Sequence, residues 1–286
     1  MTPQLLLQML VTTVGLSLGY MLIASGLSLV YGIMHMVNLA HGAIFMFGGM
    51  VAAIMISEMG LNFFAGIVIT IIVFALFGVI FEKVIFRPLR GLWLAGFMAS
   101  FGASLTMEGI SWRIFGTVGK HISLPLKGVI SLFGVHLSVE RLIIIGIGAI
   151  VMIGLYYLVY RTKLGRQMRA IEEDEEAAKL QGVSTDMVSS LAMAIGCALA
   201  AVAGVLFTAM YYVDPSVGFL PMLKAFNLVI IGGLGSLTGT AIAAIIMGII
   251  ESFGGTLLGA EAAYGMTWAL LMLVVIIRPR GIMGVA

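Results

Sequence analysis

The residues with the most evident chemistry lie in one charged segment, 161–186, which reads RTKLGRQMRAIEEDEEAAKLQGVSTD. It holds eleven of the 28 charged residues of the chain, which are 15 Lys or Arg and 13 Asp or Glu. Strong helix formers predict a helix over about 167–181, and Gly182 is placed to end it because glycine accepts a left-handed conformation. A solvated loop would explain the basic residues, but it would not explain the five consecutive acids at 172–176.

We therefore expect this helix to dock into a groove on a partner protein. Residues four apart, such as Arg169 with Glu173, can pair on one face of it. A small apolar surface, formed by Ala170, Ile171, Ala177, Ala178 and Leu180, would lie beside the acids. The candidate docking residues are Arg169, Glu173, Asp174, Glu176, Ala177, Ala178 and Gly182.

A second group of residues interrupts two apolar runs. Residues 29–50 and 228–248 both pass from an apolar stretch through a Gly-rich polar break into another apolar stretch. Broken helices in corresponding halves point to a transport path, although ordinary Gly-rich turns would give the same pattern. The candidate path or hinge residues are Asn38, His41, Gly42, Gly232, Gly233, Gly235 and Ser236. His41 is suited either to line the path or to cap and pack a helix.

Other chemistries find little support in the sequence. The glycines at 232–239 lack the Gly-Lys-Ser/Thr ending of a phosphate loop. His35 and His41 are six residues apart without a nearby Cys or carboxylate, so we expect no metal site. No paired carboxylates or Ser-His arrangement is evident at the span ends, so we expect no catalytic residue, and a net charge of +2 gives no sign of nucleic-acid binding.

Three charges lie within or beside apolar runs. Glu108 and Glu251 would each cost about 2.5–3.5 kcal/mol near the centre of a span, so we expect them to face protein or a cavity, or to reach a span end. Two isolated acids without a relay do not favour proton coupling. We expect Lys224 to extend toward the end of its span, with contact to a substrate carboxylate as the alternative.

The surrounding composition determines the fold class. The chain is 61% hydrophobic and 10% charged, and residues 1–57 contain no Asp, Glu, Lys or Arg. Since about 20 apolar residues cross a bilayer as a helix, we predict an all-α, polytopic transmembrane bundle of eight or nine spans, forming one domain over 1–286. The predicted segments are 5–30, 40–58, 61–85, 92–115, 141–160, 187–211, 219–235, 237–258 and 262–279. The segment 219–235 is short enough to be a half-helix or re-entrant.

Basic residues predict the orientation of the chain. Arg87 and Arg90, the basic residues of 161–186, and Arg278 with Arg280 form three clusters that belong on the cytoplasmic side. Placing all three there requires 219–235 to cross, with the C-terminus and 161–186 in the cytoplasm. The connection 116–140 then lies outside, where we expect a small strand pair or a segment lying on the membrane.

A resemblance to a known family sharpens this interpretation. The spacing E-A-A-x-x-x-G at 176–182 is similar to the coupling-helix motif of ABC importer permeases. Together with 26–49, the FRPLRG loop at 86–91, 161–183 and 219–252, it resembles the branched-chain amino acid ABC transporter permease family along nearly the whole chain. One departure is that VSTDMVSSLAMA follows Gly182 without the I-x-L-P of other importer permeases.

The resemblance implies a membrane subunit in a bacterial or archaeal inner membrane. Its implied partners are a second related permease, two cytoplasmic ATPases that bind ATP and magnesium, and an extracytoplasmic binding protein, with no cofactor in this chain. The implied substrates are leucine, isoleucine, valine or related hydrophobic amino acids, with urea and short amides as the alternative. A stand-alone channel or secondary transporter is the competing class of function.

Overall fold

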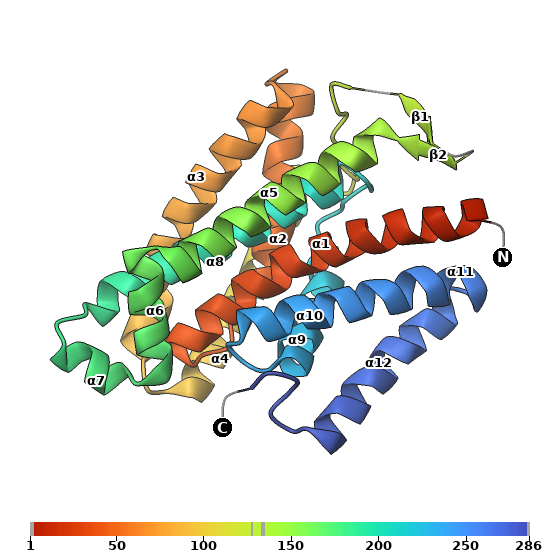
Figure 1. Ribbon diagram of the computed structural model, residues 1–286. Helices are drawn as coiled ribbons and strands as arrows, with labels where there is room; N and C mark the ends of the chain where they lie inside the picture. The colour runs from red at the N-terminus through yellow and green to blue at the C-terminus, as the bar shows by residue number, and fades with distance from the viewer. Residues whose placement is uncertain (1–2, 127, 133–134, 285–286) are drawn as a thin grey trace.

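The computed structural model describes residues 3–126, 128–132 and 135–284, and most of them are helical (Figure 1). Within this part of the chain, seven helices are long and apolar enough to cross a membrane, which confirms the all-α polytopic bundle. They are α1 (Pro3–Met34), α2 (His41–Ala53) with the π-helical turn η1 (Ile54–Glu58), α3 (Phe63–Phe81) with η2 (Glu82–Phe86) and η3 (Arg87–Leu89), α5 (Val139–Arg161), α8 (Thr185–Thr208), α10 (Leu237–Ile249) with η4 (Ile250–Gly254) and α11 (Gly255–Leu257), and α12 (Ala260–Ile277).

The remaining two predicted segments are also helices, but of a different kind. Helix α4 (Trp93–Phe115) is 23 residues long and carries Glu108 and Arg113. Helix α9 (Phe219–Gly232) has only 14 residues, so it extends about 21 Å at 1.5 Å per residue. That is less than the roughly 30 Å of a bilayer core, so α9 cannot cross by itself.

The bundle has two distinct ends (Figure 1). At one end, called here the strand end, β1 (Val129–Leu132) pairs with β2 (Val135–Ser138) in antiparallel register, with Val129 opposite Ser138. This confirms the strand pair expected in 116–140. At the opposite end, called the α6 end, α6 (Lys163–Glu173) and α7 (Glu175–Leu180) connect α5 to α8.

Two stretches cross the bundle as a helix joined to an extended piece. Residues 35–40 leave the end of α1 without helical structure, and α2 then continues toward the strand end. In the other stretch, Val213 exchanges two backbone hydrogen bonds with Lys120 near the strand end, and α9 continues to the α6 end. The segment predicted at 219–235 therefore reaches both ends only with the help of the extended residues before it.

Helix α8 forms the centre of the bundle and packs against α1, α2 and α3. Small residues let these backbones approach closely. A Cβ on Gly204 would overlap the Phe45 carbonyl oxygen of α2, and a Cβ on Gly78 would lie 2.7 Å from the Met193 carbonyl oxygen of α8. This packing explains why so many of the 37 glycines lie in helices despite their poor helix propensity.

Candidate functional site

The first predicted break begins at the exposed His35 and continues into the interior, where Asn38 and His41 are buried. His35 has φ of +51°, which turns the chain away from α1. The Asn38 side chain is fully buried and accepts a hydrogen bond from the Ala40 N–H at 3.0 Å. His41 Nε2 lies 2.9 Å from the Ile23 carbonyl oxygen, so the imidazole joins the start of α2 to α1. These residues form a packed joint, which agrees with the structural alternative for His41.

A close backbone contact lies beside this joint. A Cβ on Gly42 would overlap the Gly218 carbonyl oxygen and would lie 2.6 Å from the Met222 Cβ. Gly42 is at the start of α2 and Gly218 immediately precedes α9, so α2 and α9 begin against each other. Gly218 was not among the residues that the sequence indicated.

The second predicted break, at 233–236, turns α9 into α10. Gly233 and Gly235 have φ of +106° and +88°, a backbone conformation that favours glycine. Ser236 caps α10 by accepting a hydrogen bond from the Gly239 N–H at 3.1 Å. The Met283 N–H donates to the Gly232 carbonyl oxygen at 3.0 Å, so the C-terminal tail completes the end of α9. This break is a tight turn at the α6 end.

The two broken regions meet through the candidate residue Gly235 and two residues that were not candidates, Gly32 and Glu172. A Cβ on Gly235 would lie 3.1 Å from the Gly32 Cα and 3.0 Å from the Glu172 Oε1. The end of α1, the α9–α10 turn and α6 therefore come together at one point, called here the Glu172 junction. Through it, the charged segment contacts both discontinuous regions directly.

The charged segment contains two helices instead of the predicted single helix over 167–181. Helix α6 ends at Glu173 and α7 begins at Glu175. The reason is Asp174, whose carboxylate accepts hydrogen bonds at 2.9 Å from the N–H groups of Glu176 and Ala177. Aspartate is a favoured N-cap because it satisfies such free donors, and here it starts a new helix within the run of acids.

The candidate docking residues are divided between the inside and the outside of the segment. Arg169 donates to the Val159 carbonyl oxygen and lies over the Tyr160 ring at 5.2 Å, so its partners lie on α5. Ala178 is buried and Ala177 half-buried, whereas Glu173, Asp174, Glu176 and Gly182 are exposed. Gly182 has φ of +83°, in agreement with its predicted role as a helix terminator.

The apolar surface predicted for docking is therefore mostly used within the chain. Ile171 and Ala178 belong to the main hydrophobic core. Leu180 is the exception, because it is 90% exposed at the end of α7. Glu175 and Lys179, which are also four residues apart, form an ion pair at 2.8 Å.

Glu172 occupies an unusual electrostatic position. Its side chain keeps contact with water, but its carboxylate lies against Gly32 and Gly235. Loss of hydration in this position raises the pKa of Glu172, and the positive charge of Arg169 acts in the opposite direction. The Glu172 junction is therefore sensitive to charge as well as to shape.

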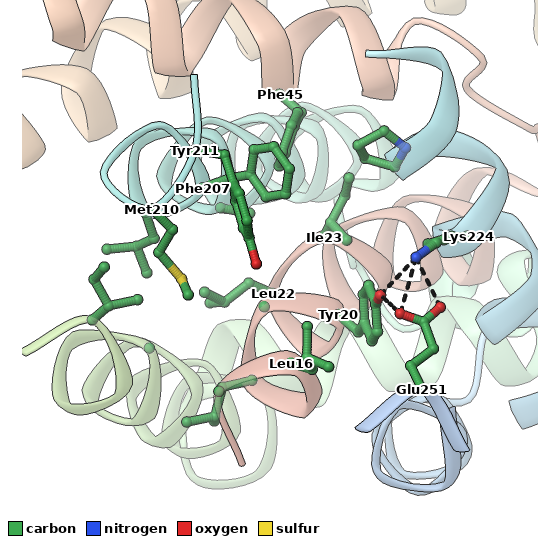
Figure 2. Close-up of a pocket in the computed structure, with 18 of the residues that line it drawn as sticks. Leu16, Tyr20, Leu22, Ile23, Phe45, Phe207, Met210, Tyr211, Lys224 and Glu251 are labelled. Atoms are coloured by element: carbon green, nitrogen blue, oxygen red, sulfur yellow. Dashed lines mark hydrogen bonds and ion pairs between the residues drawn. The ribbon is translucent and has the colours of Figure 1, made fainter. Parts of the chain in front are cut away.

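A cavity of about 330 Å³ lies between α1, α5, α8 and α9 (Figure 2). Its walls are largely apolar, and one side carries a charged cluster. Lys224 Nζ lies 2.8 Å and 3.0 Å from the two carboxylate oxygens of Glu251. The Tyr20 hydroxyl donates to Glu251 and accepts from Lys224 at 2.8 Å. Glu251 lines the cavity, which confirms the expectation that this acid faces protein or a cavity, but it is not isolated. Lys224 pairs with it instead of extending toward the end of its span.

Similarity to characterised chains agrees with a membrane transport fold. The family model described as "Branched-chain amino acid transport system / permease component" matches residues 9–277. The chain belongs to this permease family.

The permease aligns with named relatives over almost its whole length. It is 35% identical to the high-affinity branched-chain amino acid transport system permease protein BraD of Pseudomonas aeruginosa, across 97% of this chain and 95% of the relative. It is 33% identical to the corresponding protein LivH of Escherichia coli, across 94% of this chain and 93% of the relative. A shorter match, 30% identical, covers 41% of this chain and 38% of the ribose import permease protein RbsC of Escherichia coli.

A second ion cluster in the permease lies near the α6 end, and the sequence did not predict it either. Glu82 is fully buried and receives hydrogen bonds from Arg87 at 2.9 Å, Arg90 at 2.6 Å and Ser190 at 2.7 Å. Both arginines also pair with Asp186. The arginines were interpreted only as orientation signals, although their positions five and eight residues after Glu82 offered a local indication of pairing.

The Lys224–Glu251 pair of the permease offered no such indication. The two residues are 27 positions apart, and Tyr20 is 231 positions from Glu251. The other acid expected in a span, Glu108, is partly buried in α4 and lines a second, smaller cavity beside the Gly42–Gly218 contact. The expectation that it would face a cavity is confirmed.

Proposed function

We propose that this permease carries branched-chain or related hydrophobic amino acids across the inner membrane of a bacterium or archaeon, as part of an ATP-driven importer. In this proposal it pairs with a second, related permease and binds two cytoplasmic ATPases, which hold ATP and magnesium. An extracytoplasmic binding protein delivers the substrate. Family membership and the names of the relatives support the substrate class.

The observation that carries the proposal is the Glu172 junction. An importer needs a physical connection between the site where ATP is hydrolysed and the helices that open and close the path. Here α6 and α7 supply an exposed acidic surface, and Glu172 lies against Gly32 and Gly235. A displacement of α6 would therefore act on the end of α1 and on the α9–α10 turn together.

The exposed part of α7 is the proposed contact with the ATPase. Glu176 and Leu180 both project from it, and Leu180 is 90% exposed. An exposed leucine beside acids fits a groove with an apolar floor and a basic rim. Gly182 then ends the helix close to α8, so a force on α7 is transmitted to the centre of the bundle.

The test is ATP-dependent uptake of radiolabelled leucine by proteoliposomes that contain the complete complex and the binding protein. We expect Glu176→Lys combined with Leu180→Asp to reduce uptake at least tenfold and to release the ATPases during purification. Glu261→Lys is the matched control, because it reverses the charge of an exposed acid at the start of α12, far from α7. Uptake that persists in the double variant would contradict coupling through this surface.

The same assay distinguishes the competing functions. Uptake of leucine without ATPases or ATP would indicate a channel or secondary transporter. ATP-dependent uptake of urea in preference to leucine would indicate the small-amide alternative. The largely apolar cavity walls favour a hydrophobic amino acid over urea.

A further inference from the structure

We propose that the cavity in Figure 2 is a binding site, within the permease itself, for a zwitterionic amino acid with an apolar side chain. This inference rests on the proposed function, and it adds a specific site to it. Lys224 and Glu251 would bind the charged groups of the amino acid, and the apolar walls would bind its side chain.

The position of the cavity suits a substrate. Its lining runs from Thr12 and Arg141, near the strand end, to the Lys224–Glu251 pair in the middle of the bundle. It therefore lies along the length of the helices and not on the outer surface of one of them. A volume of about 330 Å³ is at the lower end of the range for small-molecule sites, roughly 300–1,000 Å³.

The charged cluster is held in place from several elements. Lys224 comes from α9, Tyr20 from α1, and Glu251 from the π-helical turn η4. Lys224 Nζ also lies 5.1 Å from the centre of the Tyr20 ring and 4.9 Å from that of Tyr264. Turns of π-helix inside α-helices are frequent at functional sites, and here the turn places a carboxylate beside the cavity.

Stability does not account for such a pair. Its side chains are only 19% and 12% exposed, and the loss of hydration of two charges offsets much of their attraction. Apolar residues of similar volume in place of a buried ion pair often leave a protein equally or more stable. A pair retained within apolar spans therefore points to a functional role.

The hydrogen bonding of Glu251 is incomplete. Oε2 accepts from Tyr20 and from Lys224. Oε1 is buried and receives no hydrogen bond from the described residues, although Lys224 Nζ lies 2.8 Å away as an ion-pair contact. With the Lys224 ammonium group as its one described contact, Oε1 keeps a second acceptor position for a donor that comes with a ligand.

An amino acid zwitterion complements this arrangement. Its ammonium group would donate to Glu251, and its carboxylate would accept from Lys224, so that positive and negative charges alternate around the cluster. No net charge would be added to the interior, which would avoid much of the cost of burying a single ion. Neutral amides and sugars would leave this pair without a matching partner.

The opposite side of the cavity selects for an apolar side chain. Leu22, Ile23, Phe45, Phe207 and Met210 line it, and Figure 2 shows Phe207 and Met210 on the side away from the charged cluster. A charged side chain would lose its hydration against these apolar groups. We expect leucine to bind at least about tenfold more tightly than alanine, since pockets of this kind discriminate by about 10–200-fold for each methylene group.

The experiment measures binding of radiolabelled leucine to the complete transporter in lipid nanodiscs, without the binding protein. Two analogues probe the charged groups: leucinol, which lacks the carboxylate, and 4-methylpentanoate, which lacks the ammonium group. For the wild type we expect both analogues to compete at least tenfold more weakly than leucine. The Lys224→Met variant should lose the preference for leucine over leucinol, and the Glu251→Gln variant should lose the preference over 4-methylpentanoate.

A variant that replaces both charged residues, called here the paired variant, controls for loss of folding. Lys224→Met combined with Glu251→Leu removes both charges and leaves neither one unpaired, so it should still assemble with the other subunits and unfold cooperatively, while leucine binding falls at least tenfold. If the cluster were only a structural connection, analogue preferences would stay at their wild-type ratios in every variant that folds. That result, or absence of leucine binding to the wild type at millimolar concentration, would overturn the proposal.

Failure of this site and failure of the importer function give different results. ATP-dependent leucine uptake that is unchanged in the paired variant would reject the cavity as the site and retain the importer. Leucine binding that depends on Lys224 and Glu251, in a transporter without ATP-dependent uptake, would retain the site and reject the importer.

Discussion

Two buried carboxylates in this permease have opposite surroundings. Glu82, at the α6 end, is surrounded by donors from Arg87, Arg90 and Ser190. Glu251, in the middle of the bundle, has one carboxylate oxygen without a hydrogen bond from the described residues and lies beside a cavity. A saturated carboxylate holds helices together, whereas an unsaturated one next to open space is available to a ligand.

The largest effect on stability should come from the saturated cluster. Glu82→Leu removes the buried carboxylate that two arginines share and leaves them only the exposed Asp186 as a partner. Breaking a buried pair from one side costs about 3–5 kcal/mol, so we expect a large fall in melting temperature and poor yield. Thermal unfolding in detergent would measure it.

The matched control for this variant is Asp186→Asn. Asp186 pairs with the same two arginines but is 58% exposed, so its loss should cost less than about 1 kcal/mol. Equal destabilisation by the two variants would contradict the assignment of Glu82 as the centre of the cluster.

The second prediction is a change that should affect the region around Glu251 and not the Glu82 cluster. Gly42→Ala places a methyl group against the Gly218 carbonyl oxygen and Met222, so α9 must shift. Overpacking of this kind costs about 1–3 kcal/mol. Because Lys224 is on α9 and the Glu82 cluster is not, leucine binding should weaken together with stability.

Gly154→Ala on α5 is the control, since nothing lies within 4 Å of the added Cβ. It should leave binding unchanged and stabilise its helix by at most about 1 kcal/mol. A Gly42→Ala protein that keeps both its wild-type melting temperature and its leucine affinity would show that the contact between the starts of α2 and α9 is not tight.

The unsaturated cluster should contribute less to stability. Replacement of Lys224 and Glu251 together, by Met and Leu, should change the free energy of unfolding by no more than about 1 kcal/mol or should increase it, because neither charge is left alone. The single variant Glu251→Leu is the contrast, since it leaves Lys224 unpaired and should be less stable than the paired variant. Thermal unfolding of both proteins tests this difference.

The sequence predicted the fold and some of the site for identifiable physical reasons. Long uncharged runs predicted the helices because a bilayer excludes unpaired charges, and glycines marked the turn at 233–236. The break of the charged helix at Asp174 was missed because an acid within a run of acids carries no special pattern. Its capping role depends on which backbone donors are free.

Contacts between distant segments could not be predicted in the same way. Gly218 was not singled out, since its importance comes only from its contact with Gly42. In the sequence, Lys224 and Glu251 are each an isolated charge, and only the packing of α9 against the other helices brings them together. The cavity beside them is a property of four helices and has no local pattern at all.

The smallest effect concerns a third carboxylate, which lies between the two extremes. Glu172 contacts Gly32 and Gly235 but remains accessible to water, and loss of hydration raises its pKa. Below the pKa of the unfolded chain, about 4.3, both states are protonated and the group has no effect on stability. As pH rises from the unfolded value to the higher folded value, the unfolded chain loses its proton first and the folded state loses stability, and above the folded value this loss is constant.

Glu172→Gln removes this cost, so the variant should become more stable relative to the wild type as pH rises from 4 to 7. The difference should be below about 1 kcal/mol, because water screens a carboxylate that remains partly exposed. Melting temperatures of the two proteins, measured across this pH range, would show it, with Glu173→Gln as the same change one residue further along α6. A difference that stays flat with pH, or that Glu173→Gln reproduces, would mean that the Glu172 junction does not distinguish this carboxylate from its neighbours. The carboxylate would then transmit motion of α6 through its shape alone.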